Sequence, residues 1–199
     1  MFENVNHSLF LFVALPYDAH GLPPFGIFVL AEWTIFAAPM LLVLLWLFGE
    51  REDRLAAVGA CLSVAFALAI AGAIASAFFH PRPFMDGLSR NFLRHAGDSS
   101  FPSDHGTLLF ALAFSMLLTP PAMNRWLWLM PMGLALTVSW ARVALGVHYP
   151  FDIFGAAIVG LVAASCIASA RGRRLRDAVT GLAERLYTLP MELKRRRHR

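Results

Sequence analysis

Long apolar runs separated by short polar stretches make up most of this 199-residue chain. A membrane span needs roughly 20 mostly apolar residues, and several runs reach or approach that length. Each should be a helix, because lipid offers no partner to unpaired backbone groups. The pattern predicts an all-α, polytopic membrane bundle of about five transmembrane helices, at Phe25–Phe48, Leu55–Phe79, Ser103–Thr119, Trp126–Leu145 and Phe151–Ala170.

Two further segments flank the predicted spans. Val5–Leu15 is apolar but too short to cross a bilayer, so we expect an interfacial helix. It lacks the basic start and nearby cleavage site of a removable signal peptide. Residues 171–199 combine leucines at spacings of three and four with many arginines, which predicts an amphipathic basic helix. We therefore divide the chain into a membrane-embedded domain, 1–170, and a cytoplasmic tail, 171–199.

Composition and charge support this division and set an orientation. The chain is 58% hydrophobic and 15% charged, outside the range of ordinary soluble domains. Ten of its 17 lysines and arginines follow Ala170, so the positive-inside rule places the tail in the cytoplasm. Counting back through five spans puts residues 80–102 and 146–150 outside. We expect the basic tail to meet anionic membrane lipid rather than nucleic acid.

Three polar motifs fall at the predicted outer ends of the spans. Ser103 is a good N-cap and Pro150 suits the first position of a helix, so two helix N-termini should face outward. Such ends bind anions, and arginine forks match phosphate oxygens. Taken singly, these residues would be caps, interface histidines or snorkelling arginines. Together they predict a phosphatase site, carried by His80-Pro81-Arg82-Pro83, Pro102-Ser103-Asp104-His105, and Arg142 with His148 and Asp152.

Histidines could alternatively form a metal cluster. His80, His95, His105 and His148 lack the spacing of metal ligands on one helix. Two arginines and two helix ends can neutralise a phosphate without a cation. We therefore expect a catalytic step that uses no metal and no cofactor.

The three motifs resemble the signature of the type-2 phosphatidic acid phosphatase superfamily, K-x6-R-P, P-S-G-H and S-R-x5-H-x3-D. The resemblance covers about residues 25–170, and the spacing of the third motif is complete. Asp104 and the segment 95–101 are similar to bacterial undecaprenyl-diphosphate phosphatases of the bacitracin-resistance type. The chain departs from the signature at Asp104, at Ala141, and at Ala75 where the lysine would fall. Arg90 or Arg94 could supply the missing charge.

The resemblance implies hydrolysis of a lipid diphosphate at the outer face of a bacterial inner membrane. It implies that His148 attacks the phosphate, that His105 acts as acid and base, and that Asp152 orients His148. The remaining implied phosphate ligands are Arg82, Ser103, Asp104 and Arg142.

Other functions stay open from the sequence alone. Within the same superfamily they are a phosphatidate or phosphatidylglycerophosphate phosphatase, or a lipid phosphotransferase. From another class, the alternative is a non-enzymatic channel or transport subunit. The oligomeric state is also open.

Glu32 is an ionisable residue inside the first predicted span, where charge is costly and usually functional. It resembles a glutamate found at this place in the same phosphatase branch. We expect it to contact the diphosphate through a proton or a cation, or to pair with an arginine. A purely structural ion pair between helices is the competing interpretation.

Overall fold

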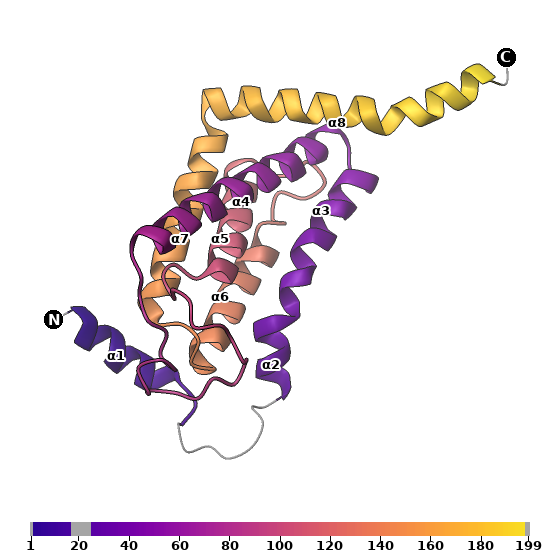
Figure 1. Ribbon diagram of the computed structural model, residues 1–199. Helices are drawn as coiled ribbons and strands as arrows, with labels where there is room; N and C mark the ends of the chain where they lie inside the picture. Colours follow the sequence, from indigo (N-terminus) through magenta and orange to yellow (C-terminus); the bar gives the residue numbers. More distant parts are fainter. Residues whose placement is uncertain (1, 17–24, 198–199) are drawn as a thin grey trace.

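Helices account for every regular element in residues 2–16 and 25–197, the part of the chain described by the computed structural model (Figure 1). Three stretches are long and apolar enough to cross a membrane: Phe25–Phe48, Arg51–Ala77 and Pro150–Ala168. Two apolar helices are shorter. The elements are α1 (Phe2–Val13), α2 (Phe25–Glu32), η1 (Thr34–Phe36), α3 (Ala37–Phe48), α4 (Arg51–Ala77), α5 (Asp104–Leu118), α6 (Leu129–Ala144), α7 (Pro150–Ala168) and α8 (Ala170–Arg197).

Helix α5 forms the centre of the bundle, packed against α4, α6 and α7. Its side chains Leu109, Leu112 and Met116 are fully buried. Helix α7 approaches it closely because position 160 is glycine. A Cβ on Gly160 would lie 2.7 Å from the backbone nitrogen of Ala111. The absence of a side chain therefore lets two backbones touch at the core.

The first predicted span is not one continuous helix. The structure interrupts it after Glu32 with the 3₁₀ turn η1 before α3 begins. Pro39 has no N–H to donate to the preceding turn, and the hydroxyl of Thr34 donates to the carbonyl of Leu30 at 2.7 Å. Both features favour a break, which leaves Glu32 at the end of a short helix.

Two other helix starts differ from the predicted bounds. Helix α4 begins four residues early because Glu50 and Asp53 form a capping box. Helix α6 begins at Leu129 rather than Trp126. The side chain of Asn124 accepts from the N–H of Trp126 at 2.9 Å and holds that segment in a turn.

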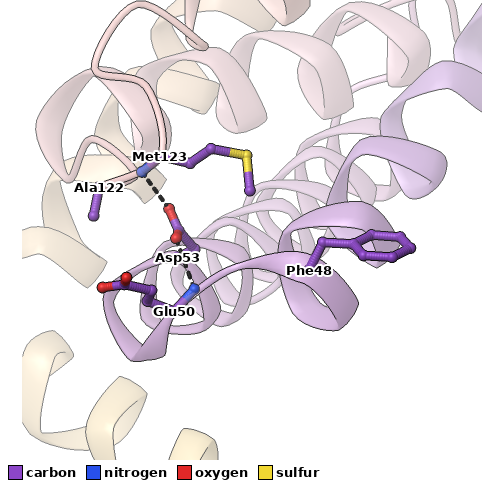
Figure 2. Close-up of a pocket in the computed structure, with 5 residues that line it drawn as sticks. All are labelled: Phe48, Glu50, Asp53, Ala122 and Met123. Atoms are coloured by element: carbon purple, nitrogen blue, oxygen red, sulfur yellow. Dashed lines mark hydrogen bonds between the residues drawn. The ribbon is translucent and has the colours of Figure 1, made fainter.

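Asp53 also joins two segments at this end of the bundle. Its carboxylate accepts from the N–H of Glu50 at 2.9 Å and from the N–H of Met123 at 2.8 Å (Figure 2). It thereby ties the start of α4 to the connection between α5 and α6. A pocket of about 260 Å³ lies beside it, lined also by Phe48 and Ala122. No histidine or arginine lines this pocket, so it is not the site predicted above.

Helix α8 crosses one end of the bundle, while α1 and the loop between α4 and α5 lie at the opposite end (Figure 1). Glu184 of α8 faces Arg54 at 3.6 Å and Arg51 at 4.0 Å at the start of α4. Side chains of α8 are described as far as Thr188. The side chains of the basic residues from Lys194 onward, and residues 198–199 entirely, lie outside the described part.

Helix α1 covers the expected interfacial segment but begins earlier, at Phe2, and ends at Val13. Phe2 and Phe12 are exposed, whereas Asn6 and Phe10 are buried against the bundle. The side-chain oxygen of Asn6 accepts from the N–H of Phe151 at 3.1 Å. Helix α1 therefore satisfies one of the free donors at the start of α7.

Candidate active site

The start of α7 brings the side chains of His148 and Asp152 close together. Pro150 occupies the first helical position and Asp152 the third, as their sequence predicts. Oδ2 of Asp152 accepts from the N–H of Tyr149 at 2.7 Å. This bond fixes the carboxylate beside the imidazole of His148.

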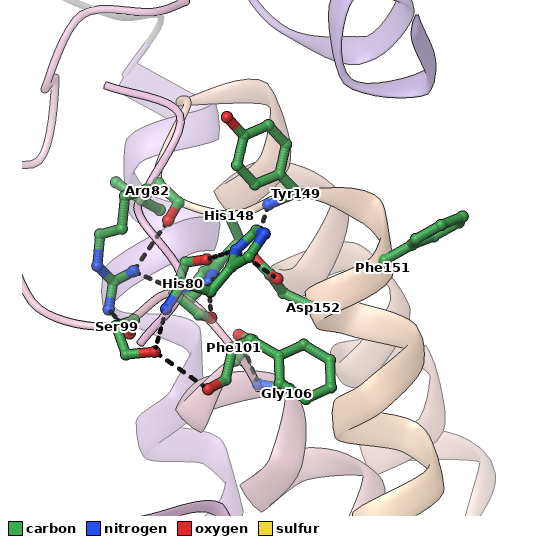
Figure 3. Close-up of polar contacts among 12 residues, drawn as sticks. His80, Arg82, Ser99, Phe101, Gly106, His148, Tyr149, Phe151 and Asp152 are labelled. Atoms are coloured by element: carbon green, nitrogen blue, oxygen red, sulfur yellow. Dashed lines mark hydrogen bonds and ion pairs between the residues drawn. The ribbon is translucent and has the colours of Figure 1, made fainter. Parts of the chain in front are cut away.

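His148 is almost fully buried, with 2% of its surface exposed. Its Nδ1 lies 2.9 Å from the carbonyl oxygen of Ser100 and 3.5 Å from Oδ2 of Asp152 (Figure 3). A carbonyl can only accept, so Nδ1 carries the proton and Nε2 keeps its lone pair. Burial, with the charges of Arg142 and Arg82, lowers the pKa of His148 to about 4 although Asp152 opposes the change. The imidazole is therefore neutral and suited to attack as a nucleophile.

Arg82 is buried, and all of its donors already face acceptors in the protein. Nε donates to Asp98 at 2.8 Å, and Nη1 donates to the carbonyl of Val147 at 2.9 Å and faces Nε2 of His148 at 3.3 Å. Nη2 donates to the carbonyl of Ser99 at 3.1 Å and lies 2.8 Å from Asp98. A phosphate can reach this guanidinium only by replacing one of these partners.

Arg142 is also buried, near the end of α6, but it is not saturated. Nη1 donates to Glu32 at 3.0 Å and to the carbonyl of Ala31 at 3.2 Å. Nε is buried and finds no hydrogen-bond partner among the described residues. A buried donor without a partner costs about 1–3 kcal/mol. The unsatisfied Nε edge of Arg142 is suited to an anionic ligand. The pairing of Arg142 with Glu32 is one of the arrangements expected for that glutamate.

The start of α5 brings the second motif to the same end of the bundle. Ser103 is the N-cap, and its hydroxyl accepts from the N–H of Gly106 at 3.4 Å. Its own N–H donates to the carbonyl of Asp152 at 3.3 Å, which joins the starts of α5 and α7. His105 is half-buried and lies near the positive charge of Arg142. Its ring makes no hydrogen bond within the described part of the chain, so it is available to a substrate.

The loop between α4 and α5 is held against the turn between α6 and α7. The hydroxyl of Ser89 donates to the carbonyl of Gly146 at 3.0 Å. Gly146 has a φ of 74°, and a Cβ there would lie 2.1 Å from the Ser89 hydroxyl oxygen. Only glycine fits this turn, and the contact explains how motifs so distant in sequence come together.

The structure thus brings His148, Asp152, Arg82, Arg142 and Ser103 to one place, with His105 beside them. Exposed positions are Asp104, Arg90 and Arg94, and the guanidinium of Arg90 lies 5.5 Å from the ring centre of Phe92. Ala75, at the position of the family lysine, is half-buried in the last turn of α4.

Three participants were missed by sequence reasoning. The carbonyl of Ser100 carries no side-chain signal, so no motif could identify it. Asp98 lies in a polar loop, and no motif marks it as the partner of Arg82. His80 stands in the first motif and was considered only as a metal ligand. Among the described residues, no three histidine, cysteine or acidic side chains gather as a metal-binding group.

Comparison with known proteins identifies the family. The family model described as the PAP2 superfamily matches residues 56–176. YbjG of Escherichia coli (strain K12) is 35% identical over 195 residues, which cover 96% of each chain. Undecaprenyl-diphosphatase BcrC of Bacillus subtilis (strain 168) is 32% identical over 133 residues, 67% of each chain.

Two further matches extend the comparison. The bacitracin transport permease protein BcrC of Bacillus licheniformis is 32% identical over 164 residues, 82% of this chain and 79% of that one. The crystal structure of Aquifex aeolicus LpxE superposes with a TM-score of 0.61 over 81% of this chain and 93% of its own, at 20% identity. This last match concerns the fold alone.

Proposed function

The chain belongs to the PAP2 superfamily, and from that premise we propose that it hydrolyses undecaprenyl diphosphate to the lipid monophosphate and phosphate. The observation that carries the proposal is the pair formed by His148, a neutral buried imidazole, and Arg142, a buried arginine with an unsatisfied Nε. One supplies a nucleophile and the other an anion-binding edge. The name of the B. subtilis relative, undecaprenyl-diphosphatase, points to the same substrate class.

The first step transfers the terminal phosphoryl group to the enzyme. Nε2 of His148 attacks the terminal phosphorus as the Nη1 contact from Arg82 opens, and the bond from phosphorus to the bridging oxygen breaks. His105, which we propose is protonated when the anionic substrate lies beside it, donates that proton to the departing oxygen. Arg142, Arg82 and the N–H groups that follow Ser103 hold the equatorial oxygens.

The second step returns the enzyme to its starting state. His105, now neutral, takes a proton from a water molecule, whose oxygen attacks phosphorus and breaks the bond to Nε2. The carbonyl of Ser100 and the carboxylate of Asp152 hold the Nδ1 proton through both steps. Two arginines and two helix N-termini carry the charge compensation, so we propose that no divalent cation takes part.

We further propose that α2 with α3, α4, α5, α6 and α7 form five transmembrane segments. The arginines of α8 favour a cytoplasmic position for that end by the positive-inside rule. The polar motifs lie at the opposite end, which therefore faces outward from the bacterial inner membrane. Residues 1–170 would be the lipid phosphatase domain, and residues 171–199 a tail that meets anionic lipid.

The name of the B. licheniformis relative favours a second candidate, a transport subunit. A channel needs polar groups along a continuous path through the bundle. Between the two ends of α4 and α5 the buried polar side chains are Ser63, Thr107 and Ser115. The hydroxyls of Ser63 and Ser115 lie 3.2 Å apart and bond to each other, and Thr107 lies in the first turn of α5 beside the site. This distribution supports the enzyme over the channel.

The decisive experiment measures phosphate release by purified protein from undecaprenyl diphosphate, phosphatidate and phosphatidylglycerophosphate. We expect the diphosphate to be preferred, with turnover retained in a chelator and abolished in His148→Ala. Labelled phosphate should be trapped on His148 after rapid quenching. Preference for a monophosphate would select the alternative phosphatases, and transfer to a second lipid would select the phosphotransferase. Full activity in His148→Ala would contradict the mechanism.

A further inference from the structure

His80 lies against both groups that face Nδ1 of His148. Its own Nδ1 is 2.8 Å from the hydroxyl oxygen of Ser100 and 3.8 Å from Oδ1 of Asp152. Oδ1 of Asp152 is buried without a hydrogen-bond partner in the described chain. The hydroxyl of Ser100 donates to the carbonyl of Pro81 at 3.3 Å, so Nδ1 of His80 can serve as the donor to Ser100.

The backbone strengthens the contact between His80 and Ser100. The N–H of Ser100 donates to the carbonyl of His80 at 2.8 Å. Ser100 is thus held on both its main chain and its side chain by one residue. Its remaining backbone oxygen is the acceptor for His148, so a shift of His80 would move that acceptor directly.

The far edge of His80 meets helix α1. Nε2 lies 3.6 Å from Oε1 of Glu3, and the ring is edge-on to Tyr149 with centroids 5.5 Å apart. Glu3 also lies 3.2 Å from Nε2 of His7, which stacks on the same tyrosine. Helix α1 therefore contacts His80 and Tyr149 beside the site, in addition to packing on the bundle.

We propose that His80 is a positioning residue for the reaction. Its Nδ1 donates to the Ser100 hydroxyl, and its ring lies against Oδ1 of Asp152 at 3.8 Å. Ser100 and Asp152 in turn position the attacking imidazole of His148. The inference rests on the proposed function and gives a role to His80, a residue of the first motif to which the family resemblance assigns none. Since the His80 ring makes no hydrogen bond to the nucleophilic nitrogen or to the proposed phosphate ligands Arg82, Arg142 and Ser103, it should act on kcat and not on KM.

Three substitutions separate this role from simple packing. His80→Asn keeps a side-chain amide near the Nδ1 position, His80→Gln moves it toward the Nε2 position, and His80→Phe keeps the ring without hydrogen bonds. We expect His80→Asn to retain kcat within about threefold. His80→Gln and His80→Phe should lose about tenfold or more in kcat with KM unchanged, since small misplacements of a reacting group are costly. His7→Phe is the matched control and should behave as the wild type.

Each other outcome counts against the proposal. Equal kcat in all three variants, rescue by glutamine but not asparagine, or a change confined to KM would overturn it. So would failure of all three to elute as folded protein, because His80 would then be structural. If the wild type releases no phosphate from any lipid diphosphate, the proposed function fails instead. Nitrogen NMR of His148 in the same variants then tests the inference. The preference for the proton on Nδ1 of His148 should be lost in His80→Phe and kept in His80→Asn.

Discussion

The protonation of His148 sets the lower pH limit of the proposed chemistry. Only the neutral imidazole can attack, and burial lowers its pKa to about 4. Protonation therefore removes the nucleophile only as pH falls through that value. We expect the single-turnover rate of phosphoenzyme formation to be insensitive to His148 protonation down to about pH 5 and to fall about tenfold per pH unit well below pH 4. An acid limb near pH 6.5, the value of an ordinary histidine, would contradict this environment.

Asp98 occupies the edge of Arg82 that a phosphate would use. Burial acts the other way, but the hydrogen bond and charge of Arg82 lower the pKa of Asp98, so this carboxylate is anionic at neutral pH. It is the most exposed of the acceptors around Arg82 and the one a substrate can displace. We expect Asp98→Asn to lower the KM for lipid diphosphate and the inhibition constant of inorganic phosphate, each about threefold to tenfold. A raised KM would mean that Asp98 instead holds Arg82 in its working position.

Glu32 is the counter-ion of Arg142 in the absence of substrate. Replacing its carboxylate with an amide keeps the shape but removes the charge that fixes the guanidinium. We expect Glu32→Gln to lower kcat/KM about tenfold, equivalent to roughly 1.4 kcal/mol in the transition state. Steady-state kinetics with Glu52→Gln, at the opposite end of the bundle, as control will measure the effect. Retained activity would assign Glu32 a hydrogen-bonding role alone.

Among the elements, the contact between α5 and α7 is the least tolerant of added volume. A Cβ on Gly160 would meet the backbone of α5, which cannot move aside as a side chain can. We expect Gly160→Ala to destabilise the protein by about 1–3 kcal/mol, as overpacking does. Gly72→Ala in α4 has open space and is the matched control. Thermal unfolding in detergent should separate the two, and equal midpoints would show that the helices can move apart.

Helix starts were predictable where the signal is local. Ser103 and Pro150 mark the starts of α5 and α7 because capping and proline geometry act within one turn. The break after Glu32 was missed since hydropathy does not register a side chain that competes for backbone bonds. The grouping of the motifs at one end followed from span counting. The Ser100 carbonyl did not, because its role depends on how a loop folds back.

At the scale of the whole molecule, orientation is the main expectation to test. With Cys61 and Cys166 replaced, single cysteines at two exposed positions report the two ends. We expect Met85→Cys, in the loop after α4, to react with an impermeant reagent from outside. Thr188→Cys in α8 should react only after the membrane is opened. The reverse pattern would invert the orientation proposed for the site.

The shortness of α5 and α6 bears on the lipid around them. At 1.5 Å per residue, helices of 15 and 16 residues rise only about 22–24 Å, whereas the hydrocarbon core measures about 30 Å. Helix α5 is enclosed by the bundle, so the mismatch falls on the lipid beside α6, which exposes Leu129, Leu136 and Trp140 and can be matched by local thinning. In the proposed orientation the outer leaflet would dip toward the end of α6. The enzyme would thus work at the bottom of a membrane depression, and bilayers of longer acyl chains would slow it.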